Sequence, residues 1–100
     1  MDKTQDSQDN EFIEITIGPD EPVFTSGVVC KLLGIPVWVL KQLDGAGIVS
    51  PPRSNTLKAR LYSKRELKKV EHCWYYIKEK KVKVPGLRVI LELEERYGEL

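Results

Sequence analysis

The chain contains few of the side chains from which metal sites and disulfide scaffolds are built. It has two cysteines and one histidine in 100 residues. Cys30 and Cys73 lie in apolar helical patterns without zinc-site spacing, and His72 has no ligand-type partner near it in the sequence. We therefore expect no metal and no cofactor, and two buried, reduced thiols of the kind found in cytoplasmic proteins.

Long apolar runs and catalytic motifs are also missing. No run approaches the roughly 20 apolar residues that a membrane span needs, and the acidic N-terminus is unlike a signal peptide. The sequence has no nucleophile–base pair, no phosphate-binding glycine loop and no carboxylate pair on one apolar face. We expect a cytoplasmic protein that is neither an enzyme nor bound to a membrane.

The net charge of +1 conceals a segregation of charge along the chain. Residues 1–22 carry seven acidic side chains and one lysine, whereas residues 53–88 carry twelve basic and three acidic ones. The basic region can meet a polyanion such as double-stranded DNA, although a lysine-rich helix is also compatible with an ordinary solvated face. Residues 1–11 are expected to be a disordered acidic tail, which we hypothesise shields the basic surface when DNA is absent.

Local patterns predict one mainly α-helical domain over residues 12–97. The alternating stretch FIEITI (12–17) predicts a strand, with a short returning strand at Val23–Phe24. A helix follows Thr25 or Ser26 as its cap. The expected elements after these strands are a helix-turn-helix at 26–45 (helices 26–33 and 36–44), a hairpin at 53–62, and helices at 64–80 and 85–97.

Particular residues set these boundaries. Gly34 ends the first helix, and Pro36 suits the first turn of the second, where its missing N–H group has no partner in any case. Ser63 and Glu66 form a capping box for the third helix, in which Trp74 is expected in the core. Pro85 opens the fourth helix.

The two short helices have the spacing of a helix-turn-helix. The small Cys30 stands where the second helix would press on the first, and Gly34 follows four residues later. Apolar residues flank the turn and recur in the second helix (Leu33, Ile35, Leu40 and Leu43). In this motif the second helix lies in the major groove of DNA. The side chains that then point outward are Val37, Trp38, Lys41 and Gln42.

These outward side chains have distinct chemistry. Gln42 can contact adenine with two hydrogen bonds, Lys41 can reach guanine or a phosphate, and Val37 can touch a thymine methyl group. Trp38 has two interpretations, a DNA contact or packing against the hairpin or a neighbouring chain, because tryptophan is a common interface anchor.

The stretches FTSGVVCKLLGIPVWVLKQLDGAGIVSPPR and ARLYSKRELKKVEHCWYYIKEKKVKVPGLRVILELE resemble the DNA-binding domain of MerR-type winged helix-turn-helix regulators, in particular their heat-shock repressor (HspR) branch. The resemblance implies about four helices and a small β-hairpin wing that lies along the DNA backbone. It places Lys41 and Gln42 at reading or phosphate-contacting positions, and Arg53, Arg60 and Tyr62 in the wing. Three further basic side chains are candidate DNA contacts because of their charge: Lys58 near the wing tip, and Lys64 and Arg65 at the start of the third helix.

The chain departs from the family pattern at several points. Family members usually have an arginine followed by tyrosines in the second helix, and an arginine where this chain has Gly45; here the run is Lys41, Gln42, Leu43. Each loss removes a phosphate contact, so weaker binding per domain is expected. The sequence also ends at Leu100, before the long dimerisation helix and effector domain of the family, which disfavours a small-molecule or metal sensor.

Functions of different classes remain open. The first is a sequence-specific DNA-binding transcriptional repressor. A domain that buries about 600–1,000 Å² on DNA rarely binds tightly alone, so a homodimer on DNA or a helping partner is expected. The resemblance implies a chaperone of the Hsp70 class as co-repressor. The second is a protein-interaction module that uses Val37, Trp38 and the pair Tyr75–Tyr76, and the third is an architectural or excisionase-like factor.

Overall fold

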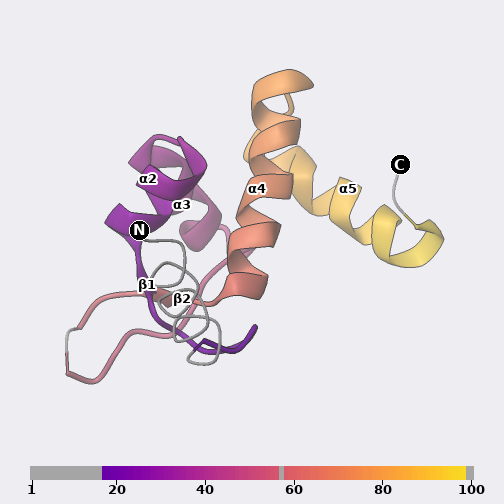
Figure 1. Cartoon of the computed structure of the whole chain (residues 1–100). Coiled ribbons are helices and arrows are strands. Elements are labelled where there is room, and N and C mark those ends of the chain that lie inside the picture. Colours follow the sequence, from indigo (N-terminus) through magenta and orange to yellow (C-terminus); the bar gives the residue numbers. More distant parts are fainter. Residues whose placement is uncertain (1–16, 57, 99–100) are drawn as a thin grey trace, which may run out of the picture.

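The computed structural model describes residues 17–56 and 58–98 (Figure 1). The fold is mainly helical, with one small antiparallel sheet, and is of the winged-helix type that the sequence predicts. Its elements in chain order are β1 (Phe24–Thr25), α2 (Ser26–Leu33), α3 (Val37–Gly45), β2 (Leu61–Tyr62), α4 (Lys64–Glu79) and α5 (Val84–Tyr97). The predicted tail at 1–11 and all but Ile17 of the predicted strand at 12–17 lie outside the described residues.

The helix-turn-helix forms as its caps predict. The Thr25 hydroxyl accepts a hydrogen bond from the Val28 N–H at the start of α2. Gly34 ends α2 in the left-handed conformation, at φ 65°, where a side chain would be strained. Pro36 is the extended residue before α3 and not part of its first turn, so α3 begins one residue later than predicted.

The sheet joins the entrances of two helices. β1 pairs with β2 in antiparallel register, Phe24 opposite Tyr62 and Thr25 opposite Leu61. β1 leads into α2 and β2 leads into α4. The pair therefore fixes the start of the helix-turn-helix against the start of α4.

The wing, residues 51–60, is less regular than the predicted hairpin. Its two arms meet in a single bridge, Arg53 opposite Arg60, closed by a hydrogen bond from the Ser54 N–H to the Ala59 carbonyl at 2.8 Å. Residues 61–62 pair with β1 instead of continuing the hairpin. Proline offers no N–H to a strand ladder, so Pro51 and Pro52 prevent the first arm from extending. Figure 1 shows the wing projecting on the side of the molecule away from α5.

One core holds the helices together. The helix-turn-helix contributes Val29, Val39, Leu40 and Leu43. The rest of the chain contributes other buried side chains, among them Tyr62, Val70, Cys73 and Leu87. Trp74, predicted in the core, is only partly buried at its edge. Burial raises the pKa of the Cys73 thiol to about 11, as expected for an unreactive core cysteine.

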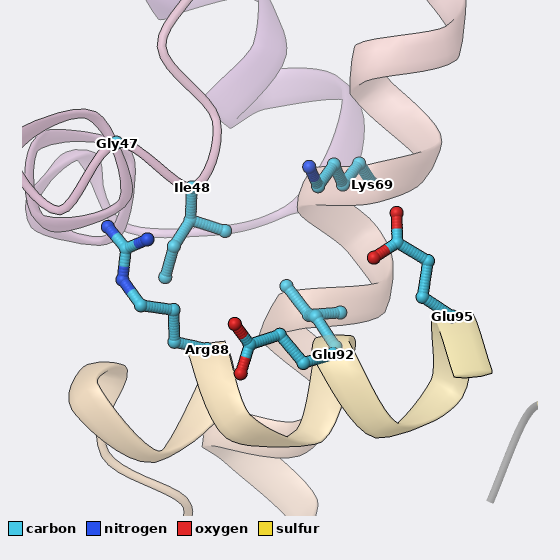
Figure 2. A pocket seen from close by; sticks show the side chains of 7 residues that line it. Gly47, Ile48, Lys69, Arg88, Glu92 and Glu95 are labelled. Atoms are coloured by element: carbon cyan, nitrogen blue, oxygen red, sulfur yellow. The ribbon is translucent and has the colours of Figure 1, made fainter. Parts of the chain in front are cut away.

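Polar contacts fix α5 against the rest of the fold. The Glu94 carboxylate accepts a hydrogen bond of 2.5 Å from the Tyr76 hydroxyl and lies 2.9 Å from Nε2 of His72, both on α4. Arg88 of α5 donates to the carbonyl of Ala46, at the end of α3. Figure 2 shows the Arg88 side chain reaching from α5 toward Gly47. α5 thus holds both α4 and the end of α3.

No helix in the described part of the chain is long and apolar enough to cross a bilayer.

Candidate nucleic-acid interface

The four residues of α3 that the sequence predicts to point outward are all exposed. Val37 is 51% exposed and Trp38 46%, and both Lys41 and Gln42 are exposed as well. The intervening apolar side chains of α3 are buried in the core. The helix thus presents one face of mixed chemistry, as its periodicity predicts.

This outward face of α3 is bordered by two hollows of different character. Val37 and Lys41 line a small hollow of about 160 Å³ next to the wing, which we term the wing-side hollow. Trp38 and Gln42 line a larger one of about 460 Å³ next to the turn between α4 and α5, which we term the turn-side pocket. α3 therefore stands between the wing and the α4–α5 turn.

The wing-side hollow gathers positive charge. Lys41 of α3 and Arg53 and Arg60 of the wing all line it, with the hydroxyl-bearing Ser26 at the start of α2. Asp44 is its one acidic lining residue. Lysine and arginine side chains that border one hollow beside an exposed helix can hold a phosphate group.

The guanidinium of Arg60 makes its contacts with other groups of the protein. Its Nε and Nη2 atoms meet the Asp44 carboxylate at 3.1 and 3.0 Å, and its Nη1 donates to the Pro51 carbonyl at 2.6 Å. Ser50 donates a third hydrogen bond to Asp44, at 2.6 Å. The Ser50 hydroxyl, together with the Arg60 guanidinium, holds the pKa of Asp44 below its usual range. Arg60 therefore ties the wing to the end of α3, and much of its charge is balanced there.

Tyr62 lies at the base of the wing, where it lines the wing-side hollow. The resemblance makes it a DNA contact at the close of the wing, but its side chain is only 2% exposed and lies in the core. Burial raises the pKa of its hydroxyl. Tyr62 also belongs to the core cluster, so its ring joins the base of the wing to the core.

Arg53 and Lys58 are the exposed cations of the wing. Arg53 donates from Nη1 to the Lys58 carbonyl at 3.3 Å, which braces the loop. Lys58 has a left-handed backbone, at φ 58°, and its N–H donates to the Ser54 carbonyl. Both side chains are exposed to solvent.

Lys64 and Arg65, predicted DNA contacts at the start of the third helix, lie against the chain that precedes β1. Arg65 forms a two-pronged ion pair with Asp20, at 2.6 and 3.2 Å, and lowers the pKa of that carboxyl. Lys64 Nζ is 3.4 Å from the Ile17 carbonyl. Neither side chain lines the wing-side hollow or the turn-side pocket. Asp20 thus balances the charge of Arg65, although Lys64 and Arg65 both stay exposed to solvent.

The structure adds two lysines that sequence reasoning did not single out. Lys81 and Lys83, from the turn between α4 and α5, line the turn-side pocket beside Trp38 and Gln42. The run KEKKVKVP contains the signal, but the same run is typical of a solvated helix end. Only the fold shows that this turn lies beside α3.

Trp38 packs on α4. Its ring meets the Trp74 ring edge to face, with centroids 6.4 Å apart and planes at 79°. Almost half of the side chain still remains exposed. Trp38 therefore joins α3 to α4 and also forms part of the outward surface of α3.

The interface just described belongs to a winged-helix class of fold, with a helix presented between two cationic borders. Within the described residues there is no group of three or more histidine, cysteine or acidic side chains that could hold a metal ion.

No model of a known protein family matches the chain. The chain is 31% identical over 81 residues to a protein described as "Putative heat shock protein HspR" from Streptomyces coelicolor. The alignment covers 81% of this chain and 53% of that relative, so the chain spans about half the length of the curated relative it matches.

Proposed function

We propose that this protein is a sequence-specific DNA-binding transcriptional regulator of MerR type, and a repressor. The single observation that carries the proposal is the position of α3: its polar and apolar outward side chains lie between cations of the wing and cations of the α4–α5 turn. A helix in the major groove has a phosphate backbone on each side. The two cationic borders suit those two backbones.

The chemistry of each side chain decides which part of the DNA it is proposed to contact. Arg53, Lys58, Lys81 and Lys83 contact phosphates and supply affinity that does not depend on sequence. Gln42 and Lys41 contact base edges, and Val37 contacts a thymine methyl group. Arg60 positions the wing through Asp44 and contributes little as a free charge.

The similarity to HspR supports the regulatory role. Homodimerisation on a two-fold operator and an Hsp70-class co-repressor belong to the same proposal. A single small domain that reads only a few base pairs would need such help to bind tightly.

The test is selection of bound sites from random duplex DNA, followed by salt titration on the selected site. Replacing both turn lysines, Lys81→Gln with Lys83→Gln, should reduce binding to every sequence and lower the salt slope by about two phosphate contacts. Gln42→Ala should instead relax the base preference at one position, with little change in nonspecific affinity.

Lys69→Gln is the matched control, because Lys69 is also an exposed lysine but lies on the other side of α4, next to α5. It should bind as the parent does. Selection that yields no preferred sequence, or turn variants that bind like the parent, would contradict the proposal.

The exposed ring of Trp38 favours a second candidate, a protein-interaction module. Tyr75 is exposed too, but Tyr76, predicted to share this surface, is buried and bonded to Glu94. Trp38→Ala separates the two candidates: loss of self-association with DNA binding intact would make Trp38 a protein contact.

A further inference from the structure

The turn-side pocket has the dimensions of a small-molecule site. Its volume of about 460 Å³ lies within the usual range for such sites, about 300–1,000 Å³. Its apolar walls are Trp38, Ile77, Val82, Val84 and Pro85, and its polar groups are Gln42, Lys81 and Lys83. An apolar body with a few polar groups at the edge is the composition that binds amphipathic ligands.

The charge of the pocket has one sign. Lys81 and Lys83 line it, and no acidic side chain does. The groove along α5, about 330 Å³, is a useful contrast, because Lys69 and Arg88 share it with Glu92 and Glu95 (Figure 2). Opposite charges balance in that groove, whereas the turn-side pocket favours an anion.

Trp38 and Lys81 give the pocket further features of a binding site. Trp38 meets Trp74 only edge to face, which leaves almost half of its surface open for a second ring. Lys81 has a left-handed backbone at φ 58°, directly after the end of α4, where glycine is usually favoured. A lysine kept at a strained position beside a pocket is consistent with a role for its charge.

We propose that the turn-side pocket binds a small planar aromatic molecule that carries one carboxylate or a similar anionic group. The ring lies against Trp38 and the apolar turn residues, and the anion faces Lys81 and Lys83, with the Gln42 amide within the same pocket. Trp38 and Gln42 also belong to the outward face of α3, so ligand and DNA exclude one another. Only this last point rests on the proposed function.

The first experiment contains no DNA. 2-Naphthoate is titrated into the full chain while NMR follows the two indole N–H signals, assigned with Trp38→Phe, and the backbone amides of residues 81–84. The expected result is a saturable shift at Trp38 and at the turn. The neutral isostere 2-naphthamide, and the double variant Lys81→Gln with Lys83→Gln, should bind about tenfold more weakly.

Lys69→Gln is again the control and should bind 2-naphthoate like the parent. Shifts that do not saturate, equal affinity for the neutral isostere, or unchanged affinity in the double variant would each overturn the proposal. An acidic peptide that shifts these signals while 2-naphthoate does not would also overturn it, and would assign the pocket to a protein partner.

The second experiment adds the selected DNA. Saturating 2-naphthoate should weaken DNA binding by the parent about tenfold or more, and 2-naphthamide at the same concentration should do so much less. If the chain binds 2-naphthoate but no DNA, the proposed function is contradicted and the proposed ligand site is supported. A chain that binds both together without competition would overturn the overlap of the two sites.

Discussion

The two borders of α3 are built in different ways. On the wing side, ion pairs and hydrogen bonds join Arg60, Asp44, Ser50 and the Pro51 carbonyl, and hold an irregular loop in place. On the turn side, the end of one helix and the start of the next pack an apolar pocket, with lysines at its edge. The wing therefore depends on a few directional contacts, whereas the turn depends on burial and backbone geometry.

The largest expected effect is the loss of the Arg60 contacts. Arg60→Ala removes the ion pair with Asp44, which keeps its hydrogen bond from Ser50, and frees the Pro51 carbonyl. We expect a loss of about 1–2 kcal/mol in the free energy of unfolding, measured by urea titration, because the pair is only partly buried. The wing should also become mobile, and DNA affinity should fall for every sequence.

The variant Arg60→Lys distinguishes two roles for Arg60: positioning the wing, or contacting a phosphate directly. Lysine keeps the charge but lacks the planar fork that meets Asp44 and Pro51 at once. If Arg60 positions the wing, Arg60→Lys should resemble Arg60→Ala in both stability and DNA affinity. A lysine variant that binds DNA as the parent does would show that the charge alone matters.

The turn side should respond in the opposite sense to a change at Lys81. Lys81→Gly relieves the left-handed backbone strain at φ 58° and should raise the free energy of unfolding by about 0.5–1 kcal/mol. The same change removes a phosphate contact and should weaken DNA binding. Lys80→Gly is the control, because Lys80 has an ordinary right-handed backbone and should lose stability. A Lys81→Gly chain that is less stable than the parent would contradict the strain argument.

Parts of the fold follow from short-range sequence patterns. The ends of α2 and the start of α4 are fixed by Thr25, Gly34 and the Ser63–Glu66 capping box, all within three or four residues of their partners. The outward face of α3 follows from helical periodicity in the same way. Such contacts are local, so the sequence alone predicts them.

Other parts depend on contacts between distant residues. Arg60 meets Asp44 from sixteen positions away, and Tyr62 is buried in β2, which pairs with the distant β1. Lys81 and Lys83 lie beside α3 only because α4 packs against Trp38. Local patterns do not reveal such long-range contacts. The sequence therefore predicted DNA contacts for Arg60 and Tyr62 without their partners in the fold, and the lysine-rich run at 78–83 looked like an ordinary solvated helix end.

Acid should weaken the wing side selectively. The pKa of Asp44 lies below its usual range, so the folded chain binds this proton less readily than the unfolded chain does. Its contribution to stability is complete above the unfolded pKa, about 3.9, and is lost as the pH falls through the lower folded value. Asp44→Asn should therefore flatten the decline in unfolding free energy between pH 5 and pH 2.

Asp20→Asn is the matched control for this experiment. The pKa of Asp20 is lowered too, mainly by its hydrogen bond with Arg65, but that pair is largely exposed to solvent. Its removal should change the pH profile less than the removal of Asp44 does. Equal profiles for Asp44→Asn and the parent would mean that the Asp44 network adds no stability.

The smallest expected effect concerns the acidic N-terminal side of the chain. Residues 17–20 lie at the start of α4, next to Lys64 and Arg65, and therefore at the end of α4 that joins the wing. Deleting residues 1–11 removes four acidic side chains and one lysine, and should raise nonspecific DNA affinity a few-fold at low salt, with little effect at about 150 mM salt, where screening is strong. The gain should be the same in the parent and in the double variant Lys81→Gln with Lys83→Gln, because the turn lysines are at the other end of α4. A gain that disappears in the double variant would place the acidic residues at the turn instead, and an affinity unchanged by the deletion would end the shielding hypothesis.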